Sequence, residues 1–224
     1  MRSRLAIPRL IINLMAITAL ILAVIVTLIH SRPFDDAGFQ ALIFANTCSS
    51  ACFAGIQPGV TTFAEAHDLL DEHHLVSQWI EPVQQADAPF GLLRWRWSSK
   101  RPALLTGTDA SLTYDRKTGV VMTFGDMQTR LTTGELLVML GQPDLGYMSG
   151  GYNDRGGPTF LHVIGYSQYQ LNLVSAIQCP MTLRALWAAP VTLQIAPTSD
   201  QTARFAPYPA HIQAILGYAA YTFC

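Results

Sequence analysis

An uncharged apolar run near the N-terminus constrains this chain more than any other feature. From Leu10 to Ile29, twenty residues pass without a formal charge. At about 1.5 Å per residue, a helix of that length covers about 30 Å, the thickness of the hydrocarbon core of a bilayer. Its backbone polar groups would satisfy one another, and the hydroxyls of Thr18 and Thr27 can bond to carbonyls one turn back. The run therefore predicts a transmembrane helix over residues 10–29.

The charges on either side of the run predict its orientation. Arg2, Arg4 and Arg9 precede it, whereas residues 32–36 hold one arginine and two aspartates. The positive-inside rule then places a short tail, residues 1–9, in the cytoplasm and the rest of the chain outside the cell membrane. A cleaved signal peptide is the alternative, but its apolar core is normally about 7–15 residues long. The longer run favours a single-pass anchor.

Four cysteines follow the apolar run: Cys48, Cys52, Cys179 and Cys224. An even number of cysteines in an oxidising compartment predicts disulfides, and four cysteines allow three pairings. We favour Cys48–Cys52 with Cys179–Cys224, because each pair would fasten one end of the domain. The alternative, that the first pair is half of a metal site, lacks a second Cys or His pair at zinc-finger spacing.

The weak charge of the chain limits its partners. The formal net charge is −1 and charged residues make up 13% of the sequence, about half of the usual share. The sequence therefore lacks the excess of lysine and arginine that is typical of nucleic-acid-binding proteins. A lightly charged surface suits an exported protein, or one that a partner partly covers.

Residues 30–58 have a mixed composition and are interpreted as a tether and a cysteine-containing loop. A helix is expected after Thr62, because Thr62 and Glu65 form a capping box and apolar residues recur at helical spacing through Leu70. The pattern then changes to period two. Strands are predicted at residues 93–97, 111–114 and 120–124, with a turn at residues 115–119.

The same plan recurs further along the chain. Thr132 and Glu135 form a second capping box, and Gly141 with Pro143 would end the helix. Strands are predicted at residues 145–148, 160–166, 168–174 and 191–195. The sequence therefore predicts an α+β fold, in which an N-terminal transmembrane helix is followed by two helix-plus-antiparallel-meander units. These units are residues 59–127 and residues 128–224, the second of which ends in an apolar tail that packs onto the domain.

Two short motifs carry a resemblance: Gly59-Val60-Thr61 before the first helix and Leu140-Gly141-Gln142-Pro143 at the end of the second. This pattern resembles the small lipoprotein of the bacterial β-barrel assembly machine, and the β-lactamase inhibitor proteins, which carry that fold in tandem. The two parts of the signature are divided between the two halves of the chain. Residues 52–61 are also similar to the opening of uncharacterised bacterial membrane-anchored exported proteins. The resemblance implies protein binding rather than catalysis.

His67, Asp71 and His74 are the best candidates for a metal site. Their spacing of i, i+4 and i+7 places two imidazoles and a carboxylate on one helix face, which suits zinc. A solvated polar helix face gives the same pattern, and neither a fourth ligand nor a general base stands out. We therefore assign no metal, no cofactor and no catalytic residue.

Residues 94–97 alternate arginine with tryptophan. On a strand this alternation gives one cationic face and one aromatic face. Paired guanidiniums could hold an anionic ligand or partner. The alternative is an ordinary half-buried strand with its indoles inward.

The glycine-rich segment 149–158 is the best candidate for a contact loop. It lacks the Lys-Ser/Thr ending of a phosphate-binding loop. Exposed loops often carry binding residues, so we expect contacts from the polar side chains Tyr152, Asn153, Asp154 and Arg155.

These features favour a membrane-tethered extracytoplasmic binding or assembly module, with an envelope protein as its partner. An extracytoplasmic hydrolase, metal-dependent through His67, Asp71 and His74, and a structural envelope protein are the alternatives. The sequence holds neither a Gly-x-Ser-x-Gly elbow nor a His-Glu-x-x-His motif, which argues against an enzyme.

Overall fold

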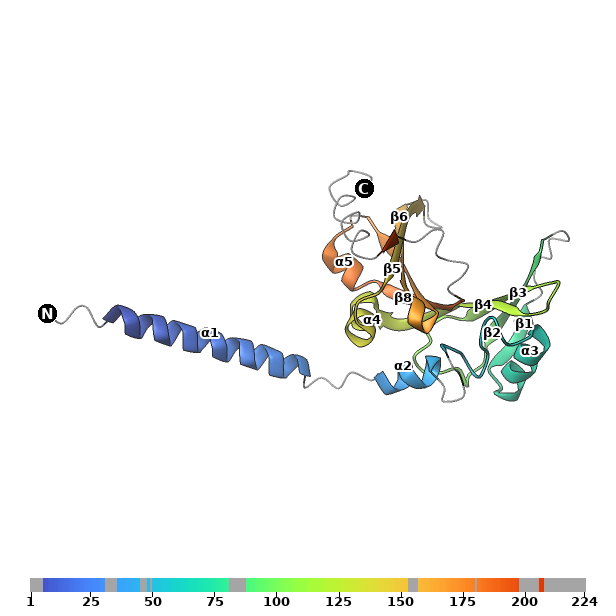
Figure 1. Ribbon diagram of the computed structural model, residues 1–224, viewed down its shortest axis with the longest axis horizontal. Coiled ribbons are helices and arrows are strands. Elements are labelled where there is room, and N and C mark those ends of the chain that lie inside the picture. Colours follow the sequence, from blue (N-terminus) through green and yellow to red (C-terminus); the bar gives the residue numbers. More distant parts are fainter. Residues whose placement is uncertain are drawn as a thin grey trace. The chain divides into compact units, whose positions relative to one another are not determined.

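The computed structural model describes residues 6–30, 36–44, 48, 50–80, 88–152, 157–179, 181–197 and 206–207 (Figure 1). Internal contacts divide the chain into two units, Met1–Asp36 and Ala37–Cys224. The first unit holds the long helix α1 (Ala6–His30), and the second holds all of the described strands. The strands thus belong to one compact unit.

Helix α1 is apolar, and its described side chains, Leu14 and Leu20 among them, are exposed. As expected, the hydroxyl of Thr18 donates to the carbonyl of Leu14 (2.9 Å), and the hydroxyl of Thr27 donates to a carbonyl one turn back. In the part of the chain that the structure describes, no helix is both long enough and apolar enough to cross a membrane. The transmembrane helix in the predicted fold class is therefore wrong.

Short helices accompany the strands: α2 (Asp36–Ile43), α3 (Phe63–Glu72), α4 (Thr133–Leu140), α5 (Leu183–Trp187) and the 3-10 turn η2 (Ser167–Tyr169). The strands are β1 (Val76–Ile80), β2 (Phe90–Trp97), β3 (Asp109–Asp115), β4 (Val121–Thr132), β5 (Leu145–Tyr152), β6 (Pro158–Tyr166), β7 (Leu171–Gln178), β8 (Pro190–Ile195) and β9 (Ala206–Pro207). Each predicted strand overlaps one of these.

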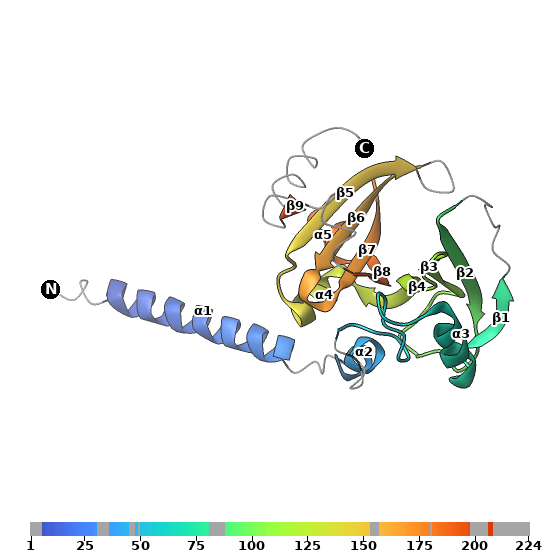
Figure 2. The ribbon, with the colours of Figure 1, turned by 45° about the vertical axis from the view of Figure 1, so that its right-hand side comes forward.

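The described strands form one antiparallel sheet in the order β1-β2-β3-β4-β8-β7-β6-β5-β9. Strands β1 to β4 are neighbours in sequence order, and so are β5 to β8, but the last strand of each set pairs with the other (Figure 2). The prediction of two helix-plus-meander units is therefore wrong. The physical reason is that an unpaired strand edge exposes backbone polar groups. Pairing of β4 with β8 gives the backbone N–H and C=O groups of both strand edges hydrogen-bond partners.

Strand β4 is the element that joins the two sets. Its first part pairs with β3, and its later part pairs with β8, with Met127 opposite Leu193 and Gln128 opposite Thr192. The boundary predicted between residues 127 and 128 lies inside this strand. A strand of twelve residues can serve two neighbours at different points along its length.

The local helix signals are confirmed. The hydroxyl of Thr62 accepts from the amide of Glu65 (3.3 Å), and the Glu65 carboxylate accepts from the amide of Thr62 (2.8 Å). Thr132 and Glu135 form the same capping box at the start of α4. Gly141 ends that helix at a φ of 78°, which favours glycine.

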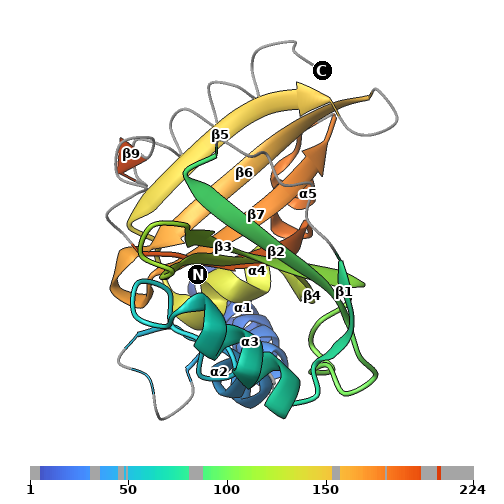
Figure 3. The ribbon, with the colours of Figure 1, turned by 90° about the vertical axis from the view of Figure 1, so that its right-hand side faces the viewer.

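Helices α2, α3 and α4 lie on one side of the sheet, here called the covered face (Figure 3). Trp95, Phe124 and Leu193 of the sheet share one hydrophobic core with Phe53 and Leu70, which come from the segments that cover it. The rings of Trp95 and Phe124 meet edge-on, with centroids 5.3 Å apart. The covered face therefore supplies the apolar burial that stabilises the fold.

Candidate binding face

The opposite side of the sheet, here called the open face, is not covered by any described helix (Figure 3). Side chains alternate between the two faces, as antiparallel strands require. On β3, Leu112 belongs to the core, whereas its neighbours Ser111 and Thr113 line the open face. On β8, Leu193 belongs to the core and Thr192 lines the open face. On these two strands the open face is thus polar where the covered face is apolar.

The open face is hollowed where the two sets of strands meet. A cavity of about 400 Å³ is lined by β3 and β4 on one side and by β6, β7 and β8 on the other. Figure 2 shows the two sets rising on either side of β4 and β8. The volume lies within the range of small-ligand sites, about 300–1,000 Å³. The β4–β8 pairing that joins the sheet therefore also creates the candidate site.

Asp126 is the one charged residue among the described residues that line the hollow. It has a left-handed backbone, with a φ of 58°, at the register shift of β4 between Phe124 and Met127. Such a bulge adds a residue to one strand and redirects its side chain, and aspartate tolerates the conformation better than most residues. The exposed carboxylate accepts a hydrogen bond from the hydroxyl of Ser111. The bulge thus places one negative charge in the hollow.

Hydroxyl and amide groups surround this carboxylate. Thr113 and Thr123 lie opposite each other on β3 and β4, and their hydroxyls are hydrogen-bonded at 2.9 Å. Thr192 and Gln194 contribute further polar groups from β8. Hydroxyls and amides both donate and accept, so they favour neither sign of charge. The charge preference of the hollow is therefore set by Asp126.

An apolar wall faces this polar part of the hollow. It is formed by Leu161 and Val163 of β6 and by Val174 of β7, with Val163 directly opposite Val174. Leu161 is 41% exposed. On β5, Tyr147 lies opposite Val163 and continues the wall. Convergent polar groups beside an apolar wall are typical of binding sites.

The alternation at residues 94–97 has the form of a half-buried strand, with both indoles in the core and both arginines exposed. Arg96 lies 3.5 Å from the carboxylate of Asp109 and donates to the side chain of Gln78 (3.2 Å). Arg94 lies opposite Ser111 in the strand register, one strand away from the hollow. Because Arg96 has internal partners, the two guanidiniums are not an equivalent pair.

Two of the three candidate metal ligands, His67 and Asp71, are brought together. In α3, Nδ1 of His67 lies 3.7 Å from a carboxylate oxygen of Asp71, and the imidazole stacks on Trp79 at 4.4 Å. His74 lies beyond the end of the helix, with a φ of 53°. Across the described ranges, no group of three or more His, Cys, Asp and Glu residues could hold a metal ion.

The predicted contact loop is described only in part. Tyr152 is the last residue of β5 and pairs with Pro158. Asn153, Asp154 and Arg155 lie outside the described residues. The glycine-rich segment therefore contributes more to the β5–β6 strands than the sequence suggested.

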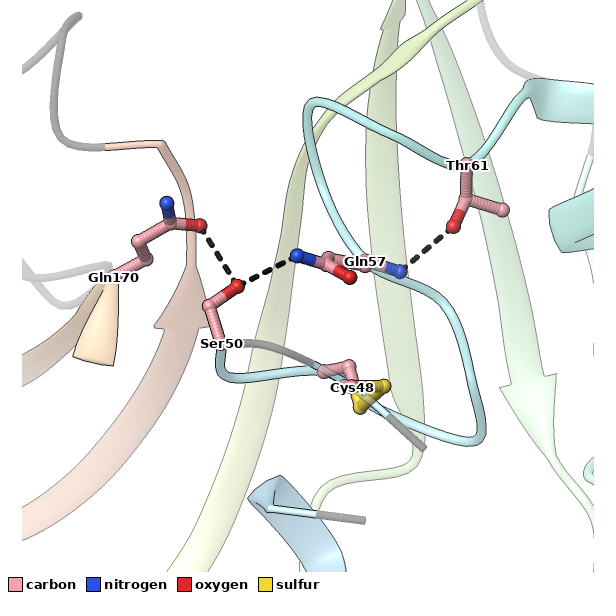
Figure 4. The surroundings of a disulfide bond; sticks show 6 residues. Cys48, Ser50, Gln57, Thr61 and Gln170 are labelled. Atoms are coloured by element: carbon pink, nitrogen blue, oxygen red, sulfur yellow. Dashed lines mark hydrogen bonds between the residues drawn. A yellow bond between two sulfur atoms is a disulfide. The ribbon is translucent and has the colours of Figure 1, made fainter. Parts of the chain in front are cut away.

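The predicted disulfide between Cys48 and Cys52 is present (Figure 4). Within the segment that it closes, the hydroxyl of Ser50 donates to the side chain of Gln170 (3.2 Å) and accepts from that of Gln57 (2.9 Å). Gln170 follows η2 in the β6–β7 connection. The disulfide segment is thus hydrogen-bonded to the β6–β7 connection.

Cys179 is also disulfide-bonded, whereas Cys224, its predicted partner, lies outside the described residues. That pairing stays a prediction. The predicted apolar tail is described only at β9, where Ala206 pairs with Gly146 of β5.

The residues that line the hollow were not among the predicted site residues. Gly125 and Asp126 interrupt the period-two pattern of β4, which is the local signal of a bulge. Pairing between β4 and β8 leaves no such local signal, because it joins residues far apart in the chain.

No protein-family model, no curated protein and no solved structure matches this chain. The geometry of the hollow is therefore the basis on which a function can be proposed.

Proposed function

We propose that this protein is a binding module of the extracytoplasmic envelope, and that its ligand-binding surface is the open face. The hollow at the β4–β8 junction carries the proposal. A sheet face that only needs to meet solvent requires neither a cavity of this size nor a charged bulge residue within it. Both features fit recognition of another molecule.

The wider open face supports a macromolecular partner. Exposed apolar side chains lie on both sides of the hollow: Phe90 and Leu92 on β2, and Tyr147 on β5 beside the lining residue Leu161 of β6. Exposed apolar groups gathered around polar residues are a common mark of protein interfaces. We propose an envelope protein as the partner.

One observation supports a place outside the cytoplasm, and a second supports attachment to a membrane. The Cys48–Cys52 disulfide is the kind of bond that persists in oxidising compartments. The described side chains of helix α1 include exposed apolar ones, among them Leu14, Leu20 and Val24, which would favour contact with lipid. We therefore propose membrane attachment through α1, with the sheet unit displayed outside the cytoplasm. Fractionation after a high-salt wash tests the attachment, and recovery of the chain in the soluble fraction would overturn it.

A blocking substitution tests the binding face. Thr192→Trp would fill the hollow, whereas Val138→Trp adds the same bulk to an exposed position on α4. Full-length variants would be purified from gently solubilised membranes, and co-purifying proteins quantified by mass spectrometry. We expect Thr192→Trp to lose a partner that wild type and Val138→Trp retain. Equal recovery with both variants, at unchanged melting temperature, would contradict the proposal.

A further inference from the structure

We infer that the hollow recognises a cationic aliphatic side chain, lysine or arginine, presented by the protein partner. This inference rests on the proposed function and specifies its ligand. Asp126 is the one charged group among the described lining residues, and the lining includes no lysine, arginine or histidine. A site with a single carboxylate and no cation attracts positive charge and repels anions.

The carboxylate of Asp126 is oriented but keeps capacity for a ligand. One of its oxygens accepts from Ser111, and a carboxylate can accept several hydrogen bonds. The ion pairs found among the described residues, which involve His67 and Arg96, do not include Asp126. Its side chain is exposed, so a cation from outside can reach it.

The apolar wall matches the rest of such a side chain. Lysine and arginine carry an aliphatic stem that packs on apolar surface while the charged end remains in a polar site. Here Leu161, Val163 and Val174 would contact the stem, and Asp126 with the neighbouring hydroxyls of Thr113 and Thr123 would accept from the charged end. A purely polar ligand would leave the wall unused, and a purely apolar ligand would leave the carboxylate unpaired.

Arg94 is the residue of this chain that would compete with an incoming cation for the carboxylate of Asp126. It lies opposite Ser111, whose hydroxyl donates to Asp126. No ion pair within 4.0 Å joins the two in the described part of the chain. An incoming cation therefore has to overcome only the longer-range repulsion of Arg94, which salt screens.

Titration of the full chain in mild detergent tests the inference directly. The probes are Nα-acetyl-lysine methylamide, its neutral Nε-acetyl form and the norleucine analogue, and the readout is backbone amide shifts by NMR. We expect the lysine probe to shift amides of β3, β4 and β7 saturably, and both neutral probes to bind at least about tenfold more weakly. Asp126→Asn should weaken the lysine probe by a similar factor, while Asp68→Asn, on exposed α3, should not.

Two results would overturn the inference. One is equal binding of the lysine and norleucine probes, and the other is undiminished lysine binding by Asp126→Asn. If either occurs while Thr192→Trp still abolishes partner recovery, only the ligand assignment fails. If partner recovery is also unaffected by Thr192→Trp, the proposed function fails with it.

Discussion

The two faces of the same sheet differ in what their residues do. On the covered face, Trp95, Phe124 and Leu193 are fully buried and share one core with the helices. On the open face, Thr123 and Asp126 are accessible from a hollow. Within a single strand, the side chains on the covered face thus stabilise the fold, and the alternating side chains on the open face are free to bind. Substitutions on the two faces should therefore separate stability from binding.

The largest effect is expected in the centre of the covered face. Trp95→Ala removes a buried indole that contacts the rings of Phe124 and Trp97. Its loss should lower the free energy of unfolding by about 3–5 kcal/mol, because a cavity remains. Chemical denaturation measures this. A loss below about 1 kcal/mol would show that Trp95 is not a core residue.

The disulfide segment should come next. Replacing both Cys48 and Cys52 by serine releases a short closed segment, residues 48–52, that directly precedes the buried core residues Phe53 and Ile56. The chain-entropy relation gives a loss of about 2 kcal/mol for so small a loop. Chemical denaturation of wild type and of the double variant, both without reductant, checks the value, because the disulfide that Cys179 makes then stays intact in both proteins.

Asp126→Asn should have the opposite effect from the core and disulfide substitutions, because it should weaken binding and leave stability almost unchanged. Asparagine tolerates the left-handed backbone and keeps a hydrogen-bond acceptor for Ser111, so stability should change by less than about 0.5 kcal/mol. Binding of the lysine probe should nevertheless fall. Comparing the denaturation midpoint with the probe titration on one preparation checks both. A variant that unfolds readily would place Asp126 among the structural residues.

The smallest expected effect is on the stability of the fold at low pH. Hydrogen bonds from the backbone and side chain of Thr62 lower the pKa of Glu65 from its ordinary value of 4.5. A lowered pKa in the folded state gives stability that is present above that ordinary value and is lost as pH falls through the folded value. Glu65→Gln should therefore show a shallower loss of stability below about pH 4.5 than wild type. Glu72→Gln, at the other end of α3, is the control, and identical acid profiles for all three proteins would contradict the assignment.

Local signals predicted the local structure well. The pairs Thr62 with Glu65 and Thr132 with Glu135 marked helix starts, because a capping box involves residues three apart. The Trp and Arg alternation marked β2 for the same reason of short range.

The candidate site could not be found in this way. Its parts come together only because β4 pairs with β8, which places Asp126 on the same open face as Val174 of β7. The repeated helix signals suggested two units, since nothing in a local pattern shows that the final strands of two similar segments will share a ladder. The bulge at Asp126 was visible only as an interruption of the period-two pattern.

In-cell photocrosslinking tests directly whether the open face is the binding face. A photoreactive phenylalanine would replace Leu161 on the open face or, as a matched exposed position on α4, Val138. We expect a discrete crosslinked partner from position 161 and none from position 138. The same partner captured equally from both positions, or from position 138 alone, would contradict this expectation.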